Sequence, residues 1–236
     1  MADRVHDAHR RRILVRTIVG IGVALALIVG GPFVYARFFA PEPADPLTLT
    51  TPTATATPEV PTGPVDIEGT WVVQAGSEAG YRLDEVLSGQ DVTVVGRTDA
   101  VTGEVTIVGG ALTTATVAVD AGSISTDEAA RDAFFRRALN TSEFPQATFV
   151  LTQPVDVSAI GQADQPLAVT APGDLTIHGV SHPVVAELQL QRTVGGVEVV
   201  GTIPVTLADF ELEAPDLGWV VVQPAGVVEV RLLLAR

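Results

Sequence analysis

From Ile67 to the C-terminus, apolar and more polar residues alternate in many short runs. Runs such as Val105/Ile107 and Val228/Val230/Leu232/Leu234 repeat with a period of two, which is typical of strands that bury one face. Residue pairs that favour turns separate the runs: Thr102-Gly103, Gly109-Gly110, Pro172-Gly173 and Gly195-Gly196. The last pair predicts a two-residue hairpin. Many short strands at close spacing indicate an antiparallel β-barrel or β-sandwich.

The segment from Thr126 to Leu139 departs from this pattern, because its apolar residues recur at helical spacing. Ala130, Phe134 and Ala138 are four residues apart, and Phe135 and Leu139 lie beside them. Charged residues fill the other side: Glu128, Arg131, Asp132, Arg136 and Arg137. We therefore expect one short amphipathic helix inserted among the strands, with Thr126 as its N-cap.

The inward-facing residues of the predicted strands are mostly Val, Ala, Leu and Ile. A barrel of eight strands is just wide enough either to be filled by side chains or to hold one slender ligand. Small branched side chains favour a cavity, although the core of a solid sandwich would have the same composition. Two alternatives therefore stay open: a barrel that holds a ligand, and a cavity-less β-domain that serves as a cell-surface interaction module.

Residues 17–36 form a 20-residue stretch without a charge. A helix of this length spans about 30 Å, enough for one membrane crossing. Five arginines precede the stretch, so the positive-inside rule places the N-terminus in the cytoplasm. A cleaved signal peptide would have a shorter apolar core and a small-x-small site, whereas this stretch runs into Arg37-Phe38-Phe39. A buried helix of a soluble domain is disfavoured by the length of the run and its basic flank. We expect an uncleaved anchor.

These features divide the chain into four parts. Residues 1–16 are a basic cytoplasmic segment, 17–36 a transmembrane helix, 37–66 a Pro/Thr-rich linker and 67–236 the β-domain. The linker has no apolar periodicity and is expected to act as a semi-extended spacer. The prediction is a single-pass protein of the cell membrane whose C-terminal domain is extracytoplasmic.

The composition excludes several kinds of chemistry. The chain has no cysteine, which removes disulfides, thiolate ligands and cysteine nucleophiles. Its formal net charge of −14 disfavours nucleic acid as a partner. The sequence contains no G-x-S-x-G motif, phosphate-binding loop or H-E-x-x-H motif. We therefore predict a protein that is not an enzyme and that needs no cofactor or metal; protein partners are not indicated.

Three pairs of polar residues invite a more specific interpretation. His178 and His182 have the spacing of metal ligands on a helix, but Gly179 and Pro183 interrupt any helix, so a hydrogen-bonded histidine at a turn is favoured. Glu211 and Glu213 could be paired carboxylates of a glycosidase, although surface carboxylates on a strand are far commoner. Arg131 and Asp132 are either a solvated helix face or polar groups at the mouth of a cavity.

Three separated motifs resemble those of the YceI-like family of lipid-binding domains. They are the Arg131-Asp132 pair on a short helix, the run Phe144-Pro145-Gln146-Ala147-Thr148-Phe149, and the run from Gly173 to Val180 that reads GDLTIHGV. The resemblance covers roughly Ile67 to Arg236. It implies a lipocalin-like antiparallel β-barrel of about eight strands that holds an isoprenoid or similar long apolar chain.

On this basis we hypothesise an apolar lipid of the isoprenoid, polyprenyl or quinone-like type as the ligand, with the Phe134/Phe135 helix flanking or closing the cavity. The expected apolar lining is Val94, Val117, Val119, Phe134, Phe149, Leu151, Leu175, Ile177 and Phe210. The expected polar groups at the mouth are Arg131, Asp132 and His178. An enzyme acting on lipids is the less favoured third alternative, because it would need titratable groups converging inside the cavity.

Overall fold

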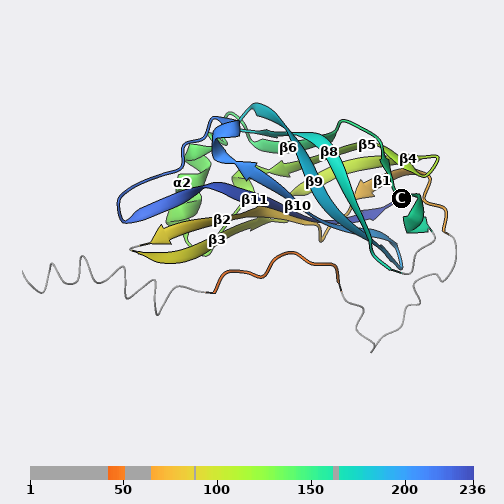
Figure 1. The fold of residues 1–236 in the computed structure, drawn as a ribbon, viewed down its shortest axis with the longest axis horizontal. Coiled ribbons are helices and arrows are strands. Elements are labelled where there is room, and N and C mark those ends of the chain that lie inside the picture. Colours follow the sequence, from red (N-terminus) through yellow and green to blue (C-terminus); the bar gives the residue numbers. More distant parts are fainter. Residues whose placement is uncertain (1–41, 51–64, 88, 162–164) are drawn as a thin grey trace, which may run out of the picture.

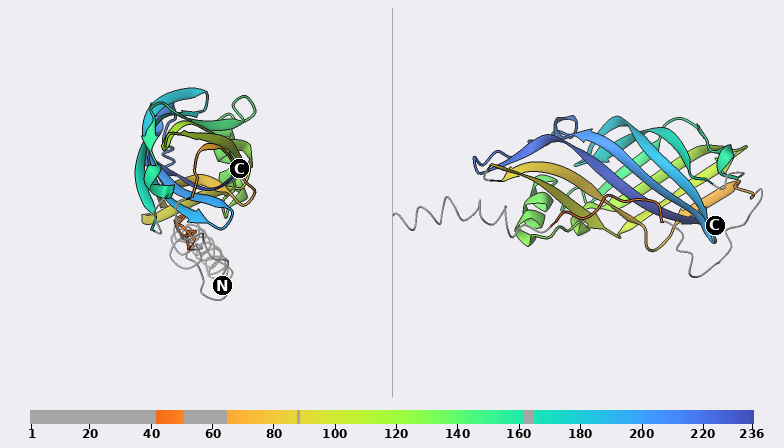
Figure 2. Two further views of the ribbon diagram at one scale, coloured as in Figure 1. Left: turned by 90° about the vertical axis from the view of Figure 1, so that its right-hand side faces the viewer. Right: turned by 60° about the horizontal axis from the view of Figure 1, so that its bottom comes forward.

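The strands of the β-domain wind around a common axis, as the end-on view in Figure 2 shows. The computed structural model describes residues 42–50, 65–87, 89–161 and 165–236. The expected transmembrane stretch 17–36 therefore lies outside the described residues. Within the described ranges, no helix is long and apolar enough to cross a membrane.

Eleven strands and four short helices make up the described part of the chain (Figure 1). The strands are β1 (Gly69–Val73), β2 (Glu78–Leu87), β3 (Gln90–Thr98), β4 (Val101–Val108), β5 (Ala111–Asp120), β6 (Gln146–Leu151), β7 (Val155–Asp156), β8 (Leu167–Ile177), β9 (Val180–Thr193), β10 (Gly196–Thr206) and β11 (Val220–Ala235). The helices are η1 (Ala121–Ser123), α2 (Ala129–Ala138), η2 (Ser158–Gly161) and η3 (Leu207–Phe210).

The sheet closes into a barrel where β1 meets β11. Val72 pairs with Ala235 and Val73 with Leu234, which completes the ring β1-β4-β5-β6-β8-β9-β10-β11. All the neighbouring strands are antiparallel. The hairpin of β2 and β3 extends the sheet from β11 beyond the closed ring. The predicted all-β, eight-stranded antiparallel barrel with one short α-helix is therefore confirmed for the described residues.

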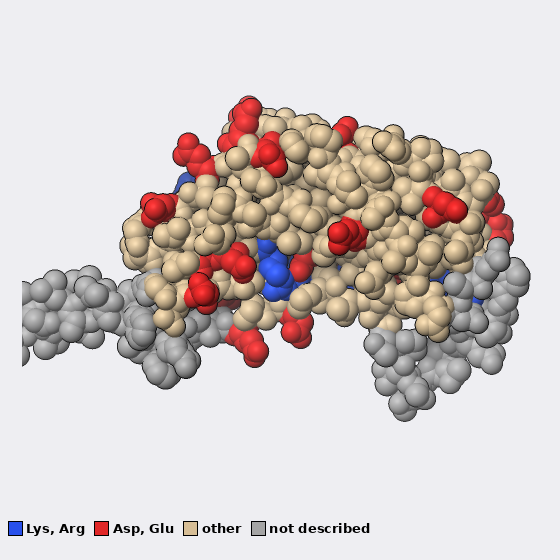
Figure 3. All heavy atoms as spheres, in the orientation of Figure 1, with Lys and Arg blue, Asp and Glu red and all other residues tan. Residues whose placement is uncertain are grey.

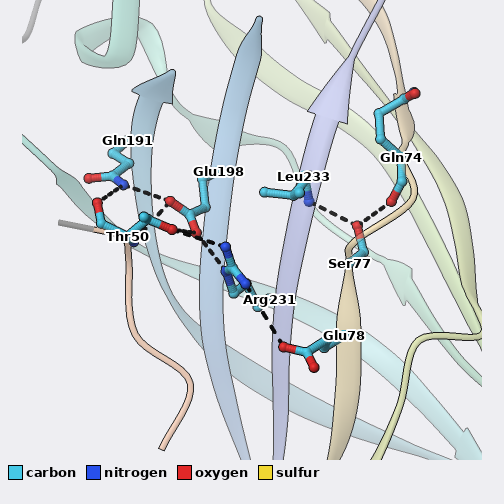
Figure 4. Close-up of polar contacts among 8 residues, drawn as sticks. All are labelled: Thr50, Gln74, Ser77, Glu78, Gln191, Glu198, Arg231 and Leu233. Atoms are coloured by element: carbon cyan, nitrogen blue, oxygen red, sulfur yellow. Dashed lines mark hydrogen bonds and ion pairs between the residues drawn. The ribbon is translucent and has the colours of Figure 1, made fainter. Parts of the chain in front are cut away.

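A kink separates β1 from β2, and one serine holds it against the neighbouring strand. The Ser77 hydroxyl donates to the Gln74 carbonyl at 2.7 Å and accepts from the Leu233 amide at 2.9 Å (Figure 4). Ser77 is almost fully buried, so these bonds satisfy a polar group that would otherwise be costly. The long strand β11 can thus pair with β1 near its C-terminal end and with β2 over its N-terminal part.

Two of the four predicted turns are confirmed. Gly109 and Gly110 adopt positive φ values between β4 and β5. The hairpin of β9 and β10 is present, and its two loop residues are Val194 and Gly195, one position earlier than the Gly-Gly pair suggested.

The other two turn predictions were wrong, because Thr102-Gly103 lies inside β4 and Pro172-Gly173 inside β8. At these sites glycine allows close approach and does not reverse the chain. A Cβ atom on Gly103 would lie 2.3 Å from the Thr116 carbonyl oxygen, and one on Gly173 would lie 2.3 Å from Cζ of Phe149.

Helix α2 covers one end of the barrel (Figure 1). The Phe135 ring stacks on Tyr81 of β2, with ring centroids 4.8 Å apart. The N-cap is Glu128, whose side chain accepts a bond from the Ala130 amide. The expectation that Thr126 caps the helix was therefore wrong: its amide and hydroxyl instead donate to the buried carboxylate of Asp132.

Residues 42–50, which belong to the expected linker, are not detached from the domain. Figure 1 shows this segment running along the outside of the barrel beneath β2 and β3. The guanidinium of Arg82 donates to the Ala44 carbonyl at 2.7 Å, and Arg97 donates to the Asp45 carbonyl at 3.2 Å. The outer face of the barrel therefore binds part of the chain that precedes it.

Candidate functional site

The interior of the barrel contains an apolar cavity of about 140 Å³. It is formed by inward-facing residues of all eight strands of the ring, among them Val117, Phe149, Leu175, Ala186 and Leu232. Trp71 lies at one end, where its indole N–H donates to the Ile67 carbonyl at 3.0 Å. The lining offers almost no polar group, so this space suits hydrocarbon.

A second cavity of about 600 Å³ lies at the end of the barrel that α2 covers. Its walls come from α2, from β2, and from the segment that joins η3 to β11. Ala147, Ile177 and Val228 line both cavities, so the two spaces meet end to end. We call the first the inner cavity and the second the mouth cavity.

The apolar stripe predicted on the helix lines the mouth cavity. Ala130, Phe134 and Ala138 all face it, and they remain accessible to solvent, with Phe134 42% exposed. Leu139, by contrast, is buried. A helix normally buries its apolar stripe against the core. Because this stripe is exposed beside a cavity, it is suited to contact an apolar ligand.

Among the polar residues that line the mouth cavity, Arg131 is paired with two carboxylates. Its guanidinium lies 3.6 Å from a carboxylate oxygen of Glu85 and 2.6 Å from one of Asp127. Tyr81 lines the same cavity, and burial raises the pKa of its phenol to about 12, although Arg131 acts in the opposite direction. Tyr81 therefore keeps its proton at neutral pH and can donate a hydrogen bond.

Sequence reasoning did not single out Tyr81 and Glu85 as site residues. The signal was present in the alternation along β2, because Tyr81, Leu83, Glu85 and Leu87 are alternate residues and all four line the mouth cavity. Glu85 is the only charged residue among the four, and it interrupts the alternation of apolar residues.

The twelve candidate residues fall into three groups. Val117, Val119, Phe149, Leu151, Leu175 and Ile177 line the inner cavity, and Val94, Phe134, Arg131 and again Ile177 line the mouth cavity. Phe210, Asp132 and His178 line neither of the two. Phe210 is fully buried and packs edge-on against the ring of His182, 6.0 Å away. Ligand contact by any of these residues stays a prediction.

His178 occupies the turn between β8 and β9. It has a φ of +55°, and its Nδ1 lies 2.9 Å from the Leu139 carbonyl oxygen, which ties the turn to the end of α2. The favoured interpretation of a hydrogen-bonded histidine at a turn agrees with this geometry. His182 instead lies 3.8 Å from the Asp209 carboxylate. Among the described residues, no group of three histidines or carboxylates could hold a metal ion.

A closed antiparallel barrel with an apolar interior that opens beside a helix defines a lipocalin-like class of barrel, able to enclose an apolar ligand. Within that class the chain belongs to the YceI-like domain family, whose sequence profile matches residues 71–233. The Protein YceI of Escherichia coli O157:H7 and that of Shigella flexneri are each 38% identical over 76 residues. The match spans 31% of this chain and about a third, 36%, of the length of these relatives.

Two solved structures share the fold. A polyisoprenoid binding domain from Saccharophagus degradans, implicated in plant cell wall breakdown, is 20% identical with a TM-score of 0.56 and aligns over 71% of this chain and 98% of its own. BcnA of Burkholderia cenocepacia is 17% identical with a TM-score of 0.53, over 70% and 99% of the respective chains. The barrel of this chain is thus a YceI-like barrel.

Proposed function

We propose that this chain is a membrane-anchored, extracytoplasmic binding protein that sequesters or carries a long-chain apolar lipid of the isoprenoid, polyprenyl or quinone-like type. The observation that carries the proposal is the apolar lining that continues from the mouth cavity into the inner cavity. Burial of hydrocarbon contributes about 0.8 kcal/mol for each CH₂ group, so a chain placed along this path gains a large gross driving force.

The sizes of the two cavities set the way in which such a lipid binds. The mouth cavity of about 600 Å³ lies within the range of roughly 300–1,000 Å³ found for small-molecule sites. The inner cavity of about 140 Å³ resembles in size an engineered apolar cavity of about 150 Å³ that accepts benzene. Most of the ligand therefore occupies the mouth, and only a slender end of it passes Ala147, Ile177 and Val228 into the barrel.

Two further considerations support the proposal. The solved domain from Saccharophagus degradans, which has the same fold, is described as polyisoprenoid binding. The uncharged stretch 17–36, preceded by five arginines, supports the membrane anchor from sequence. Anchoring would keep a lipid carrier close to the bilayer that supplies its ligand.

The two rival interpretations are less well supported. An interaction module without a cavity would have a solid interior, whereas this barrel contains two apolar cavities. An enzyme that acts on lipids would need titratable groups that converge inside the cavity, whereas the lining of the inner cavity is apolar and Arg131 in the mouth is paired with Glu85 and Asp127. We therefore propose binding as the function of the site.

The test is native mass spectrometry of the full chain, released from detergent micelles after gentle purification from membranes, followed by organic extraction of any adduct. A discrete mass increment that extracts as a polyprenyl or quinone-like lipid would support the proposal and name the ligand. An apo mass that does not change when such lipids are offered would refute it.

A further inference from the structure

Residues 42–50, which we call the strap, lie across the outer wall of the barrel at a line of ion pairs. Thr50 is the most strongly held residue: its amide and hydroxyl donate to the Glu198 carboxylate, at 3.0 and 2.8 Å, and its carbonyl accepts from Gln191 at 2.9 Å. The Thr50 hydroxyl also accepts from Arg231 at 2.9 Å (Figure 4). The strap is thus fixed by specific polar contacts.

Under the strap, two carboxylates are buried on the outward-facing side of the sheet. Glu198 is 1% exposed and is paired with Arg231, and Glu229 is 3% exposed and is paired with both Arg82 and Arg97. Carboxylates on the outside of a barrel are usually solvated, and burying them is costly unless they are paired and hydrogen-bonded. The strap supplies part of that compensation for Glu198 and accepts hydrogen bonds from both arginines of Glu229.

The strap runs towards the mouth in its N-terminal direction. Thr50 contacts Arg231, which pairs in register with Glu78 at the start of β2, whereas Ala44 contacts Arg82 farther along β2. Beyond Arg82, β2 continues through Leu83 and Leu87, which line the mouth cavity. The tilted view in Figure 2 shows the strap following the barrel in this way, with α2 at the end towards which it points.

At the same end, large apolar side chains form a rim around the mouth cavity. Phe134, Leu217 and Trp219 all line this cavity and are 42%, 58% and 57% exposed. Tryptophan is enriched where a membrane meets water, because its ring is apolar and its N–H is polar. Single exposed apolar residues are common, but three around one opening mark an interaction surface.

The length of the intervening chain limits how far Glu42, the N-terminal end of the strap, can lie from the expected anchor. Only residues 37–41 separate the uncharged stretch 17–36 from Glu42. Fully extended, they reach about 20 Å. The expected spacer of residues 37–66 is therefore shortened at its N-terminal side, because the strap takes up residues 42–50 against the barrel.

We propose that the strap holds the barrel with its rim of Phe134, Leu217 and Trp219 against the bilayer that residues 17–36 enter, so that lipid passes from the bilayer directly into the mouth cavity. The partner of the rim is the lipid surface itself. This inference rests on the anchoring in the proposed function, but it adds an orientation and an interaction surface that lipid binding alone does not require.

The two tryptophans of the chain report on opposite ends of the barrel. Trp219 belongs to the rim. Trp71 is buried in the wall of the inner cavity, on β1, which lies at the end of the barrel away from α2 (Figure 1). The full chain is reconstituted into phosphatidylcholine vesicles whose acyl chains are brominated near the headgroup, as Trp71→Phe and as Trp219→Phe. We expect Trp219 fluorescence to be quenched at least twofold relative to unbrominated vesicles, and Trp71 fluorescence to change little. Equal quenching of both, or an unquenched Trp219, would overturn the orientation.

A strap variant separates a docked rim from a brominated lipid inside the cavity. Thr50→Asp places a carboxylate against Glu198 and should release the strap, whereas Thr48→Asp is a matched control because Thr48 is exposed. Thr50→Val, a milder change, serves if the first variant unfolds. Loss of Trp219 quenching in the Thr50 variant alone supports the proposal. Unchanged quenching overturns it, since the signal would then come from lipid in the cavity.

Failure of the anchor is recognised separately. Flotation of the vesicles before the fluorescence measurement shows whether the chain is membrane-bound at all. A chain that stays at the bottom of the gradient refutes both anchoring and orientation. Lipid binding by the cavity is judged independently by the adduct seen in mass spectrometry.

Discussion

Thr50 and Glu198 are 148 residues apart in the sequence and are joined by two hydrogen bonds, of 3.0 and 2.8 Å, on the outer wall of the barrel. Arg231 donates to the same carboxylate at 2.7 Å, and Gln191 donates to it as well. One buried carboxylate thus links the strap to three neighbouring strands. Ion pairs thus join the strands of the outer wall near the strap, whereas apolar side chains line the inner wall. Figure 3 shows acidic side chains scattered over one outer face of the domain.

Acid should loosen this contact. Burial raises the pKa of Glu198, but the hydrogen bonds from Arg231, Thr50 and Gln191 outweigh it, so the pKa lies below the ordinary value of 4.5. A carboxyl group whose folded pKa is lowered stabilises the fold above its unfolded pKa and loses this effect as the pH falls through the folded pKa. We expect the free energy of unfolding in urea to fall as the pH decreases below about 4.5.

Glu198→Gln should remove this part of the pH dependence. At neutral pH it should also cost about 1.5–3 kcal/mol, the range for hydrogen bonds to charged groups. Glu211→Gln is the control, because Glu211 is exposed. Identical pH profiles of the wild type and Glu198→Gln would contradict the assignment.

The close packing of Gly173 against Phe149 predicts a large effect from a single methyl group. A Cβ atom at Gly173 would lie 2.3 Å from the Phe149 ring and 2.7 Å from the Val150 carbonyl oxygen, so Gly173→Ala must displace β6 or β8. We expect it to lower the free energy of unfolding by about 2–3 kcal/mol, as overpacked cores do. Gly195→Ala meets nothing within 4 Å and should change stability by less than about 1 kcal/mol. Equal urea midpoints for the two variants would show that β6 and β8 move apart without a measurable loss of stability.

Neighbouring positions on β9 allow a matched test of the inner cavity. Ala186 is buried in its wall, whereas Val185 points outward and is 51% exposed. Ala186→Phe should fill much of the space of about 140 Å³ and lower the amount of co-purified lipid several-fold, whereas Val185→Phe should leave it unchanged. Lipid extracted per mole of folded chain is the readout. A full lipid load in the Ala186 variant would restrict the ligand to the mouth cavity.

The sequence predicts the architecture of the barrel more fully than the details of its site. Alternation along the chain predicts the strands because one face of each is buried, and the spacing of Ala130, Phe134 and Ala138 predicts α2. The same signals mislead at Gly103 and Gly173, where glycine lets a neighbouring strand approach closely: Gly103 faces Thr116 of β5, and Gly173 faces Phe149 of β6. Turn propensity depends on a few consecutive residues, whereas the close approach of two strands depends on how the sheet assembles.

The strap could not be predicted for a similar reason. Residues 42–50 have the composition of a linker, and their contacts depend on Arg82, Arg97, Arg231 and Glu198, which come together only when the barrel forms. The site shows the same limit: Arg131 was expected at the mouth, but its partner Glu85 lies on β2, 46 positions earlier in the chain.

Phe134 offers the most direct test of the mouth cavity, because it can be changed without disturbing the core. Its side chain is 42% exposed, so Phe134→Asp should leave the urea midpoint nearly unchanged. The variant loses roughly half the contribution of a buried phenylalanine, or about 1 kcal/mol, which corresponds to a roughly fivefold weaker affinity for an apolar lipid.

Phe149→Asp instead places a carboxylate in the inner cavity and should reduce both stability and lipid load. Arg136→Gln, an exposed change on the same helix, lowers the net charge by the same single unit and is the control for charge. If folded Phe134→Asp and Phe149→Asp proteins both retained the lipid load of the wild type, the ligand would lie outside this cavity.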